Sequence, residues 1–216
     1  MGDYDFPNAV KDFVFDLHDS CRRSMRPDDQ KSLYVHQYRE ITQKYFAASE
    51  WPSCDVVKDE CESDKLFLAF YEELIGRHKF GTPSLRITLK DKLNSWKVYT
   101  NLFELIFTSS NIDMYILPEW IFEILHEYVY QFQGFSQYRT REKSRTEEEK
   151  DALTKPVGKE PWSVVDVMYT LHRLIDMSNI RHPNTPPPSQ VHETFGHFAA
   201  VSLSRLECLL GDFHAR

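Results

Sequence analysis

Two histidines and a glutamate late in the sequence come nearest to a known catalytic motif. His192, Glu193 and His197 invite comparison with HExxH, in which histidines four residues apart on one helix bind zinc. Here the interval is five residues, so the two rings point about 140° apart around a helix. That angle directs the rings to different sides. The spacing therefore predicts that these histidines do not share a catalytic metal.

The other residues that could do chemistry form no recognisable constellation. His78, His126 and His172 lie on or beside the apolar stripes of separate helical segments, which is typical of structural histidines, although a cluster in space stays open. Glu72 and Glu73 are interpreted as part of an exposed helix face. The sequence contains neither a G-x-S-x-G turn nor a Gly-rich phosphate loop. It predicts a protein that is not an enzyme and that uses no cofactor or metal.

The cysteines indicate the compartment. Cys21, Cys54, Cys61 and Cys208 form no CxxC pair, and the first residues lack the charged and apolar regions of a secretory signal. Reduced thiols in the cytosol or nucleus are the simplest interpretation. No apolar run approaches the roughly 20 residues that a membrane helix needs. We therefore expect a cytoplasmic protein that does not contact a membrane.

One basic run could touch nucleic acid. Its members are Arg139, Arg141, Lys143 and Arg145. Acidic residues follow at once, and the formal net charge of the chain is -7, from 26 Lys and Arg against 33 Asp and Glu. Strong autonomous binding of nucleic acid needs a concentrated basic face. The sequence therefore predicts only weak RNA contact through this run.

Helices must position these residues, because apolar side chains recur with a helical period along nearly the whole chain. The spacing predicts seven longer helices, a short one and no convincing strand, over residues 8–21, 34–45, 64–79, 84–106, 118–135, 147–154, 163–175 and 195–213. In this scheme Ser84 caps the fourth helix and Pro118 occupies the first position of the fifth. Thr146 and Glu149 form a capping box for the short helix.

The order of these helices favours an all-α fold in which antiparallel helical hairpins stack as an irregular α-solenoid. Residues 183–188 contain four prolines and form a stiff connector. Leu210, Gly211 and His214 resemble part of a tetratricopeptide helix. We expect residues 1–216 to form one helical-repeat domain that is the N-terminal part of a longer protein.

The composition is rich in aromatic residues and poor in glycine. There are 30 aromatic residues (15 Phe, 11 Tyr and 4 Trp) and only 7 glycines among 216 residues. The aromatics crowd residues 128–138, where they are too many for a single stripe. Core packing explains most of this excess, and a partner surface could explain the remainder. Tyr130, Phe135 and Tyr138 are the candidates for that surface.

Several strings together resemble the N-terminal half of the eukaryotic translation initiation factor 3 subunit L family. The most specific are QFQGFSQYR at 131–139 and the segment 162–180, which begins WSVV and ends SNI. Further matching strings are YEELIGRH at 71–78, TPSL at 82–85, NLFELI at 101–106, LPEW at 117–120 and LECLLGDF at 206–213. The resemblance spans roughly residues 8–214. The connector 183–188 and residues 53–63 depart from it.

The resemblance implies a non-catalytic scaffold with a helical region of the tetratricopeptide or HEAT kind. In the family, this region precedes a PCI domain with a winged helix, which this chain lacks. The family member joins the PCI subunits of the factor, pairs with subunit K and helps to bring the factor to the small ribosomal subunit. A helical subunit of another PCI assembly, such as the proteasome lid or the COP9 signalosome, stays an alternative. So does an enzyme with an unrecognised site at His192 or His197.

Overall fold

The computed structural model describes residues 6–23, 27–141, 145–154, 160–182 and 184–211, except for the side chains of Ala152 and Thr154. It confirms the predicted all-α solenoid, since the described residues form helices and no strand. The elements are α1 (Asn8–Arg22), α2 (Pro27–Lys31), the π-helix η1 (Ser32–Gln37), α3 (Tyr38–Tyr45), α4 (Cys54–Val57), α5 (Lys65–Gly81), α6 (Leu89–Thr108), α7 (Pro118–Thr140), α8 (Glu147–Thr154), α9 (Val164–Met177) and α10 (Gln190–Leu210).

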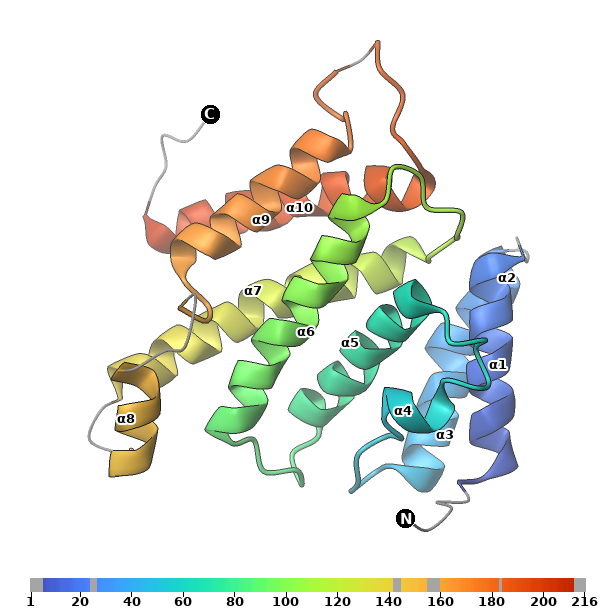
Figure 1. Cartoon of the computed structure of the whole chain (residues 1–216), viewed down its shortest axis with the longest axis horizontal. Helices are drawn as coiled ribbons and strands as arrows, with labels where there is room; N and C mark the ends of the chain where they lie inside the picture. Colours follow the sequence, from blue (N-terminus) through green and yellow to red (C-terminus); the bar gives the residue numbers. More distant parts are fainter. Residues whose placement is uncertain (1–5, 24–26, 142–144, 155–159, 183, 212–216) are drawn as a thin grey trace.

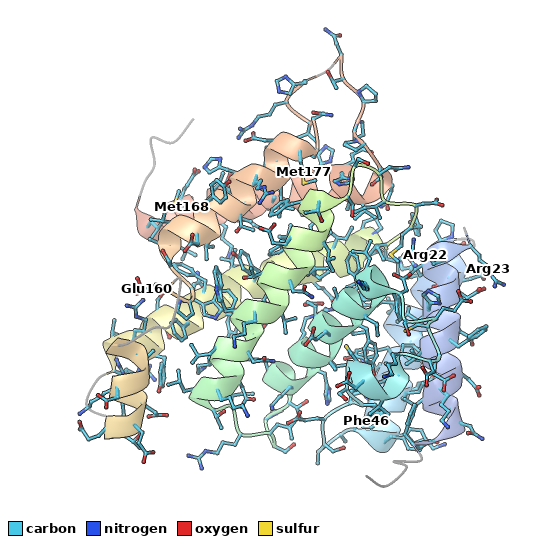
Figure 2. The ribbon with its side chains drawn as sticks, viewed as in Figure 1. Arg22, Arg23, Phe46, Glu160, Met168 and Met177 are labelled. Carbon is cyan, nitrogen blue, oxygen red and sulfur yellow. The ribbon has the colours of Figure 1, made fainter. Side chains whose placement is uncertain are left out.

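The helices are arranged as a series of packed neighbours (Figure 1). The first hairpin pairs α1 with the continuous segment α2–η1–α3, and the second pairs α5 with α6. The long helix α7 passes behind α6 in this view, and α10 packs on both α7 and α9. Side chains fill the space between the ribbons (Figure 2). No helix in the described part of the chain combines the length and the hydropathy that a membrane crossing requires.

Local capping chemistry explains several helix starts. Pro118 occupies the first turn of α7, as predicted, and its missing N–H would have had no partner there. Thr146 and Glu149 form the predicted reciprocal bonds before α8, with N···O distances of 3.1 and 3.2 Å. The prediction that Ser84 caps the fourth helix is wrong. Thr88 does so, because Asp91 three residues later completes a capping box with it.

The last helix starts earlier than its apolar spacing predicted. Ser189 caps α10 and accepts a hydrogen bond from the backbone N–H of His192. The helix ends at Leu210, where Gly211 adopts a left-handed conformation (φ 77°) that suits glycine. The predicted helical positions Phe213 and His214 lie outside the described residues.

Aromatic rings form the centre of the core, as their abundance indicated. The largest fully buried side chains are Trp120, Trp162, Tyr71 and Tyr128. Tyr128 of α7 lies 5.1 Å from Phe103 of α6 and 5.4 Å from Trp162, measured between ring centroids. Rings at this separation pack favourably beyond the area they bury. They join α6, α7 and the segment that precedes α9.

The loop before α7 connects both ends of the chain. The backbone N–H of Tyr115 donates to the carbonyl of Cys21 at the end of α1, over 2.8 Å. The amide of Gln30 in α2 donates to the carbonyl of Tyr115, and the amide of Gln190 in α10 donates to that of Ile116. Segments about 90 and 74 residues apart are therefore held at one loop.

Candidate protein-interaction surface

The two histidines of the imperfect zinc motif lie in different environments, as their spacing predicted. His192 is buried, with Nδ1 at 2.7 Å from the hydroxyl of Ser189 and Nε2 at 3.4 Å from the carbonyl of Ile106. His197 is exposed, and its Nδ1 lies 2.9 Å from the carbonyl of Glu193. Burial lowers the pKa of His192, so it is held as a neutral structural ring.

The three histidines that the sequence places on or beside apolar stripes lie on three different helices. His78 on α5 contacts the carbonyl of Ser49, His126 on α7 is exposed and stacks on Phe122, and His172 lies on α9. Within the described residues, no three His, Cys, Asp or Glu side chains are placed to hold a metal ion.

The cysteines of the N-terminal half are poor nucleophiles. Cys21, Cys54 and Cys61 form no disulfide, and burial raises their pKa to about 12, 12 and 11. A thiol with such a pKa carries almost no thiolate at neutral pH, and the thiolate is the reactive form. These side chains pack as small hydrophobic groups. The fourth cysteine, Cys208, is exposed on α10.

Glu73 corrects the interpretation of Glu72 and Glu73 as an exposed face, because it is only 2% exposed. Arg77, one turn later on α5, donates from Nε to Glu73 over 3.1 Å. Tyr99 of α6 donates its hydroxyl to the same carboxylate over 3.3 Å. Burial raises the pKa of Glu73, and the positive charge of Arg77 opposes that rise.

The buried charge pair extends to two further helices. The guanidinium of Arg77 also donates to the hydroxyl of Tyr34 over 2.8 Å and to Glu123 of α7. The Tyr34 hydroxyl in turn donates to Glu123 over 2.5 Å. Tyr34 lies in η1, a π-helix, which is a rare form with i to i+5 hydrogen bonds. This network fixes η1, α5, α6 and α7 to one another.

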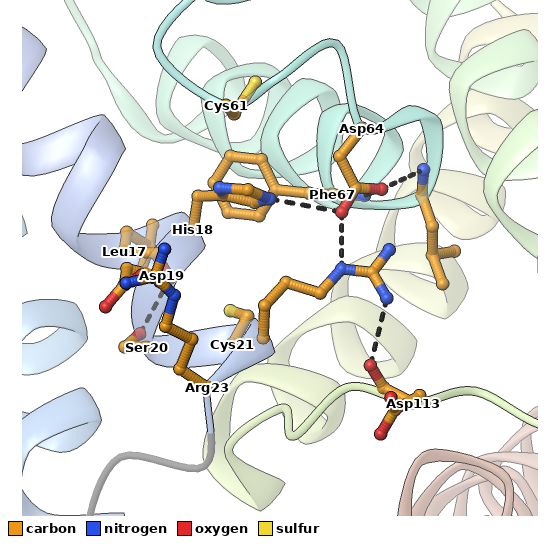
Figure 3. A network of polar contacts seen from close by, with 12 residues as sticks. Leu17, His18, Asp19, Ser20, Cys21, Arg23, Cys61, Asp64, Phe67 and Asp113 are labelled. Carbon is orange, nitrogen blue, oxygen red and sulfur yellow. Dashed lines mark hydrogen bonds and ion pairs between the residues drawn. The ribbon is translucent and has the colours of Figure 1, made fainter.

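A second carboxylate, Asp64, joins α1 to the start of α5 (Figure 3). It accepts hydrogen bonds from the backbone N–H groups of Leu66 and Phe67 and thereby caps α5. Arg22 donates to Asp64 over 2.6 Å, and His18 lies 3.2 Å from the same oxygen. Burial alone would raise the pKa of Asp64, but these donors and the charge of Arg22 hold it below its usual value.

Most of the exposed large hydrophobic side chains lie on three helices of the C-terminal half of the chain. Ten large ones are exposed among the described residues, and seven of them lie on α7, α9 and α10. We call these seven the apolar surface: Phe122, Tyr130, Val165, Tyr169, Val201, Leu209 and Leu210. The other three, Phe15, Val35 and Val56, are spread over α1, η1 and α4.

The three aromatic residues proposed for a partner surface have different environments. Tyr130 is 58% exposed and belongs to the apolar surface. Phe135 is 2% exposed and packs inside the chain, so it offers no surface. Tyr138 is half-buried, with the ammonium of Lys92 and the guanidinium of Arg145 at 5.8 and 5.4 Å from its ring centroid. Of the three, Tyr130 is the most exposed.

Part of the basic run is engaged with its own chain. Arg139 pairs with Glu160, and Arg145 stacks on Tyr138 and donates to the carbonyl of Arg139. Arg141 is exposed at the end of α7, and Lys143 lies outside the described residues. The described part of the run is therefore not an open basic face.

Sequence reasoning missed most of the apolar surface, although a signal was present. Val165 and Tyr169 lie at i and i+4 on α9, beside the half-buried apolar residues Val164 and Met168. Apolar residues just outside a buried stripe indicate a second apolar face. They are 70% and 61% exposed.

Comparison with known proteins gives the family. Residues 91–216 match the family model described as RNA polymerase I-associated factor PAF67. The chain is 32% identical over 199 residues to proteins from Gallus gallus and Homo sapiens that are named eukaryotic translation initiation factor 3 subunit L, covering 85% of this chain and 35% of theirs. A protein of the same name from Drosophila yakuba is 31% identical over 96% of this chain and 41% of its own length.

The match covers most of this chain but only part of its relatives. The chain spans about a third of the length of the first relatives. The residues matched by the family model include α7, α9 and α10, which carry the apolar surface. The resemblance to the family is thus confirmed over most of the sequence. The chain belongs to the eukaryotic translation initiation factor 3 subunit L family.

Proposed function

We propose that this chain is a non-catalytic scaffold element of eukaryotic translation initiation factor 3 that supports assembly of the initiation complex on the small ribosomal subunit. The observation that carries the proposal is the apolar surface on α7, α9 and α10 in a chain whose relatives are named as subunits of that factor. Exposed apolar residues gathered on neighbouring helices favour burial against another protein.

The chemistry of the described side chains suits such a role. The buried His192 is neutral and the thiols of Cys21, Cys54 and Cys61 are protonated, so these groups are structural. The carboxylate of Glu73 is engaged with Arg77 and Tyr99 rather than open to a substrate. Their common effect is to hold helices in fixed positions, which a scaffold requires.

The partner we propose is another subunit of the factor, and subunit K in particular, which the resemblance implies. The same assembly would place the chain in the cytoplasm. We further propose that residues 1–216 act as one helical-repeat domain at the N-terminal side of the family architecture. A subunit of the proteasome lid or the COP9 signalosome is the competing assignment, and the names of the matched relatives support the initiation factor instead.

Affinity purification with identified partners tests the proposal. Tyr169 and Val201 are both 61% exposed in the apolar surface, so the double variant Tyr169→Ser/Val201→Ser alters the surface without opening the core. Phe15→Ser is the matched control, because Phe15 is 49% exposed on α1, outside the apolar surface. We expect the wild type and the control to recover initiation factor subunits, including subunit K, and the double variant to recover at least tenfold less.

Two results would contradict the proposal. Recovery of proteasome-lid or signalosome subunits with no initiation factor subunit would assign the chain to another assembly. Equal recovery by the double variant and the wild type would show that the apolar surface is not the contact.

RNA binding by this chain is proposed to be weak. The net charge of -7 and the pairing of Arg139 with Glu160 both favour that outcome. We expect binding to a single-stranded RNA to fall steeply between 50 and 200 mM salt, as about one counterion is released per contacted phosphate. Nanomolar binding at physiological salt would contradict this.

A further inference from the structure

The connector between α9 and α10 carries a run of three prolines and projects away from the helices (Figure 1). Thr185, Pro186 and Pro188 are exposed and Pro187 is half-buried. The proposed scaffold function does not use this segment.

The three prolines determine the conformation of the run. Each proline ring sets its own φ near about -65°, and the residue before a proline avoids the helical region. Thr185, Pro186 and Pro187 each precede a proline, so this stretch is confined to extended conformations. Together these limits favour polyproline II, which has about three residues per turn and no internal hydrogen bonds, at Pro186 and Pro187, between bends at Thr185 and Pro188. The backbone conformation of these two prolines is therefore already set in the free protein.

Both ends of the connector are anchored. Ser178 is buried at the end of α9, and Ser189 caps α10. Two turns precede the three prolines. The backbone N–H of His182 donates to the carbonyl of Asn179 over 2.8 Å, and the backbone N–H of Thr185 donates to the carbonyl of His182 over 2.9 Å. The side-chain amide of Asn179 donates to the carbonyl of Pro186 over 3.1 Å. Anchoring of this kind lowers the ordering cost of binding.

The proline rings lie beside α10 but stay open to solvent, since Pro186 and Pro188 are exposed and Pro187 is half-buried. Pro186 and Pro187 line a hollow of about 240 Å³ together with Glu193 and His197 of α10. Arg181, on the preceding turn, pairs with Asp176 at 3.5 Å, but both side chains are more than half exposed. An exposed pair of this kind contributes little stability, so Arg181 can exchange its partner.

We propose that Thr185–Pro188 is a docking segment for a small domain that binds polyproline II in a groove lined by aromatic rings, as SH3 and WW domains do. Such a groove packs rings against proline side chains and donates hydrogen bonds to the exposed carbonyls. A groove with a carboxylate beside its rings fits best, because Arg181 and His182 lie exposed before the prolines.

Binding of the 216-residue chain to an immobilised panel of purified SH3 and WW domains tests this proposal. The test variant is Pro187→Ala/Pro188→Ala, which keeps the carbonyl that Asn179 contacts. Pro83→Ala is the matched control, because Pro83 is an exposed loop proline without a proline neighbour. We expect at least one domain to bind saturably, with affinity unchanged in the control and at least tenfold weaker in the double variant. A synthetic peptide of residues 180–190 should compete for the same domain.

Three results would overturn the proposal. They are no saturable binding by any domain of the panel, equal affinity of the double variant and the wild type, and binding that the peptide does not displace. Circular dichroism of both variants shows whether the chain keeps its helix content. The peptide competition decides the matter without any folded variant. Failure here would leave the proposed scaffold function untouched, since the apolar surface is a different set of residues.

Discussion

The N-terminal and C-terminal sides of this chain hold their helices together by different means. On the N-terminal side, charged networks around Glu73 and Asp64 connect α1, η1, α5, α6 and α7. On the C-terminal side, α10 packs closely on α9 and α7 through apolar side chains and a glycine. That side also carries most of the exposed hydrophobic residues.

The difference supports the contact surface that we propose. A buried charge network specifies one arrangement of its helices but exposes little apolar area, so it offers a partner little to bury. The C-terminal side leaves apolar side chains in water, which a partner can cover. The first region therefore maintains the shape of the scaffold, and the second is the proposed contact.

The largest expected effect is loss of the buried arginine. Arg77→Met should lower the free energy of unfolding by about 3–5 kcal/mol, because it leaves Glu73 buried with its carboxylate uncompensated. Urea denaturation followed by circular dichroism measures the loss. The double variant Glu73→Leu/Arg77→Met should recover most of it, since a buried pair replaced by apolar residues costs little.

The control for this prediction is an exposed pair. Arg173→Met removes the pair that Arg173 forms with Glu104 at 3.2 Å on the surface, which should change stability by less than about 1 kcal/mol. Equal losses for Arg77→Met and Arg173→Met would show that the network does not maintain the N-terminal side.

A smaller loss is expected where α9 and α10 meet. A Cβ atom on Gly196 would lie 2.0 Å from the hydroxyl of Ser178 and 2.3 Å from its Cβ. Gly196→Ala should therefore separate the hairpin and lower the free energy of unfolding by about 1–3 kcal/mol. Differential scanning fluorimetry of the purified variant checks this.

Gly134 on α7 is the matched control, because no atom lies within 4 Å of the position its Cβ would take. Gly134→Ala should be neutral or stabilising by up to about 1 kcal/mol, since alanine is the better helix former. A stable Gly196→Ala protein would mean that close packing does not determine the C-terminal side. Partial recovery by Ser178→Gly in the Gly196→Ala background would support the steric explanation.

The carboxylates of Asp64 and Glu73 should make the stability of the fold change with pH in opposite directions. The pKa of Asp64 is lowered on folding, so its contribution to stability is complete above its unfolded pKa and is lost as pH falls through the folded pKa. The pKa of Glu73 is raised, so it lowers stability as pH rises from its unfolded pKa through its folded pKa. We expect this change in the free energy of unfolding with pH to be smaller than the loss caused by Gly196→Ala.

Unfolding curves between pH 3 and 7 separate the two groups. Asp64→Asn should flatten the acid loss of stability below about pH 4, the range in which an unfolded aspartate titrates. Glu73→Gln should remove the fall in stability that begins above the unfolded glutamate pKa. If stability depended on pH in the same way in both variants, the prediction that Asp64 and Glu73 act in opposite directions would be wrong.

The smallest effect on stability is expected at the apolar surface. Tyr169→Ser and Phe15→Ser should each change the free energy of unfolding by less than about 0.5 kcal/mol, because both side chains are about half exposed or more. Chemical denaturation measures this directly. A loss above about 2 kcal/mol for Tyr169→Ser would place that ring in the fold rather than in a contact.

The helices and several of their caps could be predicted from the sequence. Pro118 and the Thr146–Glu149 capping box were identified because proline at a first turn and a reciprocal cap are local events. Thr88 was missed in favour of Ser84, although the Thr88 to Asp91 spacing was visible. The divergent sides of His192 and His197 also followed from spacing on a single helix.

The site residues were harder to predict because burial depends on elements far apart in the chain. Phe135 and Tyr130 lie on the same helix, yet one is buried and the other is 58% exposed. Glu72 and Glu73 are neighbours, and only the second faces α6 and Arg77. Periodicity places such residues around a helix axis, but it does not tell which sides of that helix are covered.

By itself, the sequence determined an all-α protein of the initiation factor 3 subunit L family with no shared zinc ligand pair at His192 and His197. These properties rest on local spacing and on strings of neighbouring residues. Only the tertiary structure decided that Glu73 is a buried ion-pair member and that the apolar surface lies on α7, α9 and α10. Those properties arise when helices distant in sequence exclude water from some side chains and leave others in it.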